Sequence, residues 1–268
     1  MDQGCRDLLD EYRELDTLCA TLDEAQWRQP GPFHGWSAWD EIAHLCYFDE
    51  AALQAARDPE AFVASARALN ALMERGGQIS AVARDHFGPL PGAALRQRWQ
   101  TGYEELVQAL AALDPRARLP WYGPTMSARS FVTARLMETW AHGQDVWDLL
   151  RRRRPPSLRL RHIAHLGVTT FAWCFVNRGL ALPGPAPRVE LRGPDGELWS
   201  WGEPGQAGLV SGVAEDFCLV VTQRRHVADT GLQIQGDAAA RWLVLAQCFA
   251  GPPADGPAPG VRLVRFDP

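Results

Sequence analysis

The first half of the chain repeats apolar side chains with the period of an α-helix. In residues 5–25 they recur every three or four positions, from Leu8 through Tyr12 and Leu15 to Cys19. The same period continues in four further segments, residues 37–58, 59–76, 93–113 and 128–153. Four or five amphipathic helices within about 150 residues predict a helical bundle whose apolar stripes face a shared core.

Short signals mark where these helices begin and end. Ser37 is a suitable N-cap for its helix, with Asp40 and Glu41 close behind it in the first turn. The last of the helices ends in the arginine run 151–154, which suits the negative end of its dipole, and Pro155 stops it. Glycine, proline and polar residues predict loops at residues 29–35, 77–92 and 119–126.

The pattern changes after Pro156. Residues 158–180 read as one helix closed by Gly179, and residues 183–203 read as two short strands around the turn GPDG. Three more elements follow, a helix at 214–226, a strand at 230–236 and a helix at 237–250 with Gly251 just past its end. The Pro/Gly-rich tail from residue 252 is expected to be a loosely held extension.

The fold class that follows is α+β, mainly α. A helical bundle over residues 1–155 precedes a small α+β domain over residues 156–268.

Composition narrows the classes of protein that fit. The formal net charge of −5 and the pI near 5.8 do not suggest a nucleic-acid or acidic-membrane partner. The N-terminus is charged throughout, and no apolar run reaches the ~18–20 residues of a membrane span. Six scattered cysteines without a CxxC pair predict free buried thiols in a reducing compartment. A cytoplasmic protein is therefore expected.

One helix carries a pair of possible metal ligands. Glu138 and His142 are four residues apart, so their side chains share a face, and their neighbours in METWAHGQDVWDLL are largely apolar. Taken alone, such a pair is more often hydrogen-bonded than metal-bound. His44 lies in a second apolar helix, and bundle helices bring such side chains together. Two imidazoles and a carboxylate suit zinc or another divalent first-row ion, with Asp145 as a natural acceptor for a ligand N–H.

Two stretches carry a resemblance to a known family, GWSAWDEIAHLCYFDEAAL at 35–53 and ARLMETWAHGQDVWDLL at 134–150. Together they resemble the DinB/YfiT-like metal-binding fold and, within it, the mycothiol-dependent maleylpyruvate isomerase group of actinobacteria. The resemblance covers roughly residues 5–155 and implies a DinB-like four-helix bundle that binds a divalent metal, usually zinc. The ligands that it implies are His44, Glu138 and His142. The second half resembles an uncharacterised branch, so the named reaction does not transfer with the fold.

Other candidates admit two interpretations each. Arg224 and Arg225 follow an apolar helix, where they either interact with its dipole or form an anion clamp for a substrate carboxylate, as the resemblance suggests. His162 and His165 are either packed on a helix face or paired on a metal. Three aromatic residues are expected to line the mouth of a pocket, namely Trp36, Trp121 and Tyr122.

The chemistry of the predicted site leaves three hypotheses open. The first is an enzyme that adds a low-molecular-weight thiol such as mycothiol to an electrophilic small molecule, as an isomerase or S-transferase. The second keeps the metal without the thiol, in a hydrolase, dehydratase or cyclase. The third is a non-catalytic metal-binding protein, although a structural zinc normally has four protein ligands. Expected partners are a small-molecule substrate and the thiol, and the chain is expected to be a monomer or a homodimer.

Overall fold

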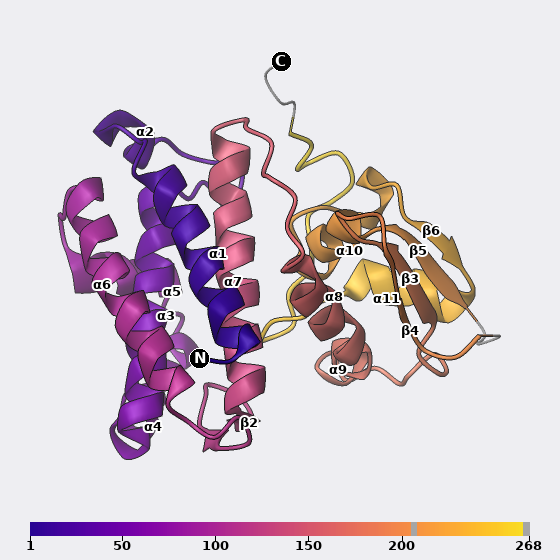
Figure 1. The fold of residues 1–268 in the computed structure, drawn as a ribbon, viewed down its shortest axis with the longest axis horizontal. Coiled ribbons are helices and arrows are strands. Elements are labelled where there is room, and N and C mark those ends of the chain that lie inside the picture. The colour runs from indigo at the N-terminus through magenta and orange to yellow at the C-terminus, as the bar shows by residue number, and fades with distance from the viewer. Residues whose placement is uncertain (205–207, 265–268) are drawn as a thin grey trace. The chain divides into compact units, whose positions relative to one another are not determined.

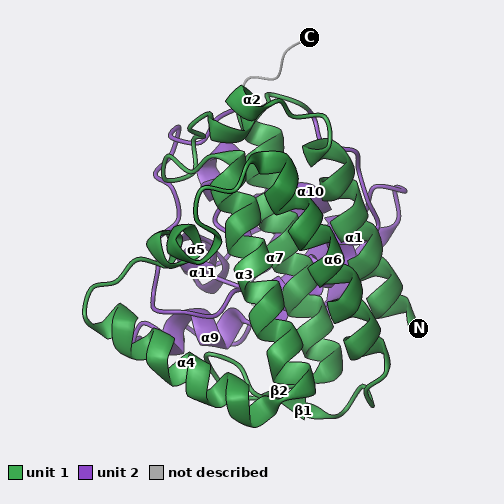
Figure 2. Cartoon of the chain, turned by 90° about the vertical axis from the view of Figure 1, so that its left-hand side faces the viewer, with its two compact units in different colours: residues 1–152 green, residues 153–268 purple. Residues whose placement is uncertain are grey.

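The structure, a computed structural model, describes residues 1–204 and 208–264. Its internal contacts divide the chain into two units, Met1–Arg152 and Arg153–Pro268 (Figure 2). The first unit is helical, and the second combines helices with a small sheet, so the predicted α+β, mainly α fold class is confirmed. Among the helices in the described ranges, none is long and apolar enough to cross a membrane.

Four long helices of the first unit run side by side as a bundle (Figures 1 and 2). They are α1 (Gln3–Cys19), α3 (Ala38–Arg57), α6 (Gly92–Ala111) and α7 (Ala128–Leu149). Helices α1 and α3 both pack against α6 and α7, which encloses one core between the four helices. The shorter elements are α2 (Glu24–Arg28), α4 (Pro59–Glu74), α5 (Ile79–Phe87), β1 (Arg118–Leu119) and β2 (Met126–Ser127).

A buried carboxylate lies at the centre of this core. Asp49 on α3 is 1% exposed and accepts hydrogen bonds from one residue on each of the other three bundle helices. Tyr12 Oη lies at 2.5 Å, Trp99 Nε1 at 3.0 Å, and Arg135 donates through Nε at 3.0 Å and Nη2 at 2.8 Å. Burial raises the pKa of Asp49, and the Arg135 charge and these hydrogen bonds oppose that rise.

The N-terminus of α3 is fixed by a capping box. Ser37 Oγ accepts from the Asp40 N–H at 3.3 Å, which confirms Ser37 as the predicted N-cap. Asp40 Oδ2 in turn accepts from the Ser37 N–H at 3.0 Å. Arg84 Nε on α5 donates to Asp40 Oδ1 at 2.7 Å. Burial alone raises the pKa of Asp40, but Arg84 and Ser37 outweigh it and leave that pKa below its ordinary 3.8.

Three predictions in the first unit were wrong in detail. The loop predicted at 77–92 contains α5, whose only buried side chains, Ala83 and Phe87, are too few to show a period. The loop predicted at 119–126 has a short strand at each end, β1 and β2, and the two strands pair as an antiparallel hairpin. Helix α7 ends at Leu149, ahead of the arginine run, because Arg151 adopts a left-handed φ of 53°. The Arg151 and Arg152 N–H groups then close the helix on the carbonyls of Asp148 and Trp147.

The second unit packs helices against a four-stranded sheet of order β4-β3-β5-β6 (Figure 1). Its strands are β3 (Arg188–Arg192), β4 (Leu198–Trp201), β5 (Leu209–Val213) and β6 (Gln233–Gln235). Its helical elements are α8 (Leu160–Thr169), α9 (Phe171–Val176), α10 (Ala214–Val221), α11 (Asp237–Leu245) and the 3₁₀ turn Val227–Asp229. The predicted β3–β4 hairpin is confirmed, whereas β5, which runs parallel to β3, was missed.

Three predictions in this unit need correction. The single helix expected at 158–180 is divided at Thr170, although Gly179 does close its second part. Helix α11 ends at Leu245 because the next residues turn away, and the Cys248 N–H pairs with the Val221 carbonyl instead. The described part of the tail is tied down, since Ala254 bonds to Gln247 and Gly260 to Asp229. Residues 265–268 of that tail lie outside the described residues.

All six cysteines lie within the described ranges. Each is buried as a free thiol, which confirms the expectation from their scattered spacing. Burial raises the pKa of the Cys5 thiol to about 12, and it raises the pKa of the other thiols for which a shift is resolved.

The Asp49→Asn substitution should strongly destabilise the fold. It leaves the Arg135 charge buried without its counter-ion, a loss of about 3–5 kcal/mol. Urea unfolding followed by circular dichroism measures this change. Asp10→Asn on the exposed face of α1 is the matched control and should stay within about 0.5 kcal/mol of the parent. A loss below about 1 kcal/mol in Asp49→Asn would show that the pair does not hold the core.

The Asp40 carboxyl should make stability depend on pH in acid. The pKa of Asp40 is lower in the folded state than in the unfolded state. Its contribution to the unfolding free energy is therefore complete above the unfolded-state pKa and is lost as pH falls through the folded-state pKa. We expect the unfolding free energy of Asp40→Asn to fall less steeply than that of the parent below about pH 4. Parallel curves for the two proteins in urea titrations at several pH values would contradict this.

Candidate metal centre

Two helices bring the three predicted ligands together. His44 lies in the second turn of α3, and Glu138 and His142 lie one turn apart on α7. Each offers a ligand atom, and these atoms all lie within 4.8 Å of one another. The His142 side chain is buried at 7% exposure, whereas Glu138 is 26% exposed, so the group is closed on one side and accessible on the other.

The position of this group follows from the register of the two helices. Asp49 on α3 pairs with Arg135 on α7, and Glu41 on α3 contacts His142 on α7. Glu41 precedes Asp49 by eight residues, whereas His142 follows Arg135 by seven. The two helices are therefore antiparallel. A rise of 1.5 Å per residue puts the Asp49–Arg135 pair roughly 11 Å along the helices from the Glu41–His142 contact. The buried ion pair thus fixes how far α3 can slide along α7.

The electrostatics of His142 favour a cation between it and Glu138. His142 Nδ1 lies 2.7 Å from Glu41 Oε2. An ionised carboxylate only accepts, so with Glu41 ionised this contact would place the ring proton on Nδ1. In the neutral ring the lone pair is then on Nε2, which lies 3.4 Å from Glu138 Oε2. Two acceptors at this distance repel each other unless a metal ion or a second ring proton lies between them.

The spacing fits a small divalent ion. Zinc binds nitrogen and oxygen at about 2.1 Å, so two ligand atoms of a tetrahedral site lie roughly 3.4 Å apart. The separation of 3.4 Å between His142 Nε2 and Glu138 Oε2 matches this value. The ligand atoms of the group, including that of His44, lie within 4.8 Å of one another, so a small inward movement of His44 brings it into range. Three ligands leave a coordination position for water or a substrate. These residues therefore fit the metal that the sequence implies.

A second group shares the same histidine. Glu41, His142 and Asp145 are all buried, and their ligand atoms also lie within 4.8 Å of one another. The sequence predicts Asp145 as an acceptor for a ligand N–H, and this role stays a prediction. Glu41 makes the 2.7 Å contact at Nδ1. Sequence reasoning treated Glu41 only as an acid in the first turn of its helix. Its spacing of three residues from His44, which places both on one face of α3, was the signal available.

Aromatic rings surround the two histidines. Trp36 stacks on His142 at a centroid distance of 6.1 Å and lies 5.4 Å from His44, so this predicted pocket residue is at the site. Trp121 and Tyr122 are one layer farther away. The ring centroid of Phe48 lies 4.7 Å from that of His44, and the ring centroid of Tyr122 lies 5.5 Å from that of Phe48. Trp121 stacks on Phe62. Their expected role in lining a pocket stays a prediction.

The predicted anion clamp belongs to the second unit. Arg224 and Arg225 are buried, and their Nη1 atoms donate to the carbonyls of Thr222 and Arg224, respectively, at 2.8 Å. Their role toward a substrate stays a prediction. Among the described residues, neither His162 nor His165 belongs to a group of three ligand side chains. His165 Nδ1 instead accepts from Trp201 Nε1 at 3.2 Å.

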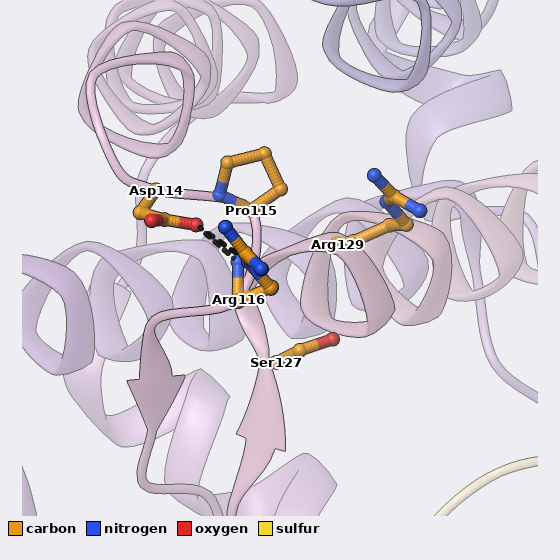
Figure 3. A pocket seen from close by; sticks show the side chains of 5 residues that line it. All are labelled: Asp114, Pro115, Arg116, Ser127 and Arg129. Atoms are coloured by element: carbon orange, nitrogen blue, oxygen red, sulfur yellow. Dashed lines mark hydrogen bonds and ion pairs between the residues drawn. The ribbon is translucent and has the colours of Figure 1, made fainter.

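A cavity of about 650 Å³ opens at the start of α7, away from the metal ligands (Figure 3). Arg129, in its lining, precedes Glu138 by nine residues, or roughly 14 Å along the helix. The full lining is Asp114, Pro115, Arg116, Ser127 and Arg129. None of the predicted site residues contributes to it.

Comparison with known proteins places the chain in a family. Residues 8–147 match the family model of the mycothiol maleylpyruvate isomerase N-terminal domain. Uncharacterised proteins from two strains of Mycobacterium tuberculosis are 43% identical over 250 residues, which cover 93% of this chain and 96% of each relative. The family match spans α3 and α7, the helices that carry His44, Glu138 and His142.

Solved structures show the same fold at lower sequence identity. A crystal structure of the mycothiol-dependent maleylpyruvate isomerase superposes with a TM-score of 0.53 at 15% identity. That of a histidine-to-alanine mutant of the same enzyme gives 0.56 at 14% identity, and each covers 87% of this chain and 91% of the other. This chain belongs to the family of the mycothiol maleylpyruvate isomerase N-terminal domain.

Proposed function

We propose that this chain is an enzyme that binds a divalent metal, with zinc favoured, and adds a low-molecular-weight thiol to an electrophilic small molecule. The observation that carries the proposal is the convergence of His44, Glu138 and His142 within 4.8 Å in a chain of this family. The proposed thiol is based on the structurally similar maleylpyruvate isomerase, which is mycothiol-dependent.

The residues of the site have distinct tasks in this proposal. His44, Glu138 and His142 would hold the metal, with one carboxylate charge against the two charges of the ion. When bound, such an ion acts as a Lewis acid that lowers the pKa of a thiol or water at an open position. Trp36, stacked on His142, shields that ring from water on one face. Arg224 and Arg225 are proposed to hold an anionic substrate group.

The reaction itself balances without an oxidant or reductant. The thiol gives its proton to solvent, and its sulfur forms a bond to the electrophilic carbon while the π electrons move to the neighbouring atom. Reversal of these steps after rotation about the former double bond, which the addition has made single, gives an isomerase. Retention of the carbon–sulfur bond, with a proton from solvent added to the neighbouring atom, gives an S-transferase.

Zinc content tests the metal. The zinc-loaded parent should hold about one ion per chain in elemental analysis after dialysis. His44→Ala and His142→Ala should each lose that zinc, because each removes one of three ligands. His86→Ala, an equivalent change at a partly exposed histidine outside the group, should keep it. Full zinc content in both ligand variants would exclude this set of ligands.

Thermal stability in the presence of mycothiol tests the thiol. Binding at about 100 times the dissociation constant should stabilise the zinc-loaded protein by roughly 2.7 kcal/mol, which calorimetry detects as a higher Tm. Chelator-treated protein should not respond, because the metal supplies the binding position. An unchanged Tm of the zinc-loaded protein would contradict thiol addition and favour thiol-independent hydrolysis, dehydration or cyclisation at the same metal.

A further inference from the structure

Glu41 links the two helices of the metal centre. It lies three residues before His44, so both side chains project from the same face of α3. From there it reaches His142 on α7, with Oε2 at 2.7 Å from Nδ1, and both residues are buried. The contact joins residues 101 positions apart in the chain.

The contact decides which nitrogen of His142 can bind a metal. A neutral imidazole has one N–H and one lone pair, and only the lone pair binds an ion. In water the neutral ring of histidine prefers its proton on Nε2, and that form would direct an N–H at Glu138. A carboxylate at Nδ1 reverses the preference and leaves the lone pair on Nε2, which faces Glu138 at 3.4 Å.

The orientation of the ring supports this assignment. Trp36 stacks on His142 with an angle of 17° between the planes, and Phe33 meets it nearly edge-on at 87°. These two aromatic rings restrict how the imidazole can tilt. Within that plane, the contacts at 2.7 Å and 3.4 Å place Nδ1 toward Glu41 and Nε2 toward Glu138.

We propose that Glu41 is a positioning residue that keeps His142 in the Nδ1–H tautomer and so makes Nε2 the metal-binding nitrogen. The inference rests on the proposed function for its metal, but the tautomer is a property of the metal-free protein. Histidine ligands commonly donate their other N–H to a carboxylate, which fixes the ring and raises its basicity. Loss of such a partner typically lowers metal affinity about 10–100-fold.

Two measurements test the role of Glu41. Nitrogen-15 NMR of the metal-free protein, at a pH where the ring is neutral, should show His142 as the Nδ1–H tautomer. Glu41→Ala should shift it toward the Nε2–H form and weaken zinc binding about 10–100-fold in competition with a chelating dye. Glu41→Gln should keep the tautomer, because the amide oxygen still accepts from Nδ1–H, and should lose less affinity.

Asp40→Asn is the matched control. It removes one negative charge from the neighbouring position, but Asp40 bonds to Ser37 and Arg84 instead of His142. We expect its tautomer and zinc affinity to equal those of the parent. Circular dichroism verifies that each variant is folded, and if Glu41→Ala is not folded, the tautomer of the parent and of Glu41→Gln decides.

The outcomes separate this inference from the proposed function. An Nε2–H tautomer in the metal-free parent, or unchanged tautomer and affinity in Glu41→Ala, overturns the role of Glu41. A parent that has the Nδ1–H tautomer but binds no zinc supports the control of the tautomer by Glu41 and contradicts the metal function.

Discussion

The carboxylate of Asp49 is the contact on which the bundle depends. It is buried on α3 and receives hydrogen bonds from Tyr12 on α1, Trp99 on α6 and Arg135 on α7. A charge in such a place is tolerated only because a guanidinium and two further donors replace the water that it has lost. Apolar packing alone allows helices to slide, whereas this set of donors is complete at a single register of the four helices.

The register of the helices also sets the relative positions of the metal ligands. His44 precedes Asp49 by five residues on α3, and Glu138 follows Arg135 by three residues on α7. Both predicted ligand helices therefore carry one member of the buried ion pair close to the site. A shift of one helix turn, about 5.4 Å, would separate His44 from Glu138 and His142 by more than the span of a zinc site. The buried ion pair of the core and the metal ligands thus lie at different heights along the same two antiparallel helices, α3 and α7.

Much of this arrangement could be predicted from the sequence. The helical period located the bundle helices, Ser37 marked the start of α3, and the Glu138–His142 spacing placed two side chains on one face. His44 was joined to them by its apolar surroundings and by the family resemblance. Short elements could not be predicted because they bury too few side chains to show a periodic pattern; α5, for example, buries only Ala83 and Phe87. The end of α7 was misplaced because a left-handed Arg151 has no marker comparable to glycine.

The sequence by itself determined the approximate positions of the long helices and the shared face of Glu138 and His142, because both depend on spacing within one helix. Only the tertiary structure decided that Glu41 is the carboxylate at His142 Nδ1 and that Arg135 is the partner of Asp49. These pairs lie 101 and 86 residues apart in the chain. Their identity depends on how far two helices slide and rotate against each other, and the packed core of all four helices fixes that movement.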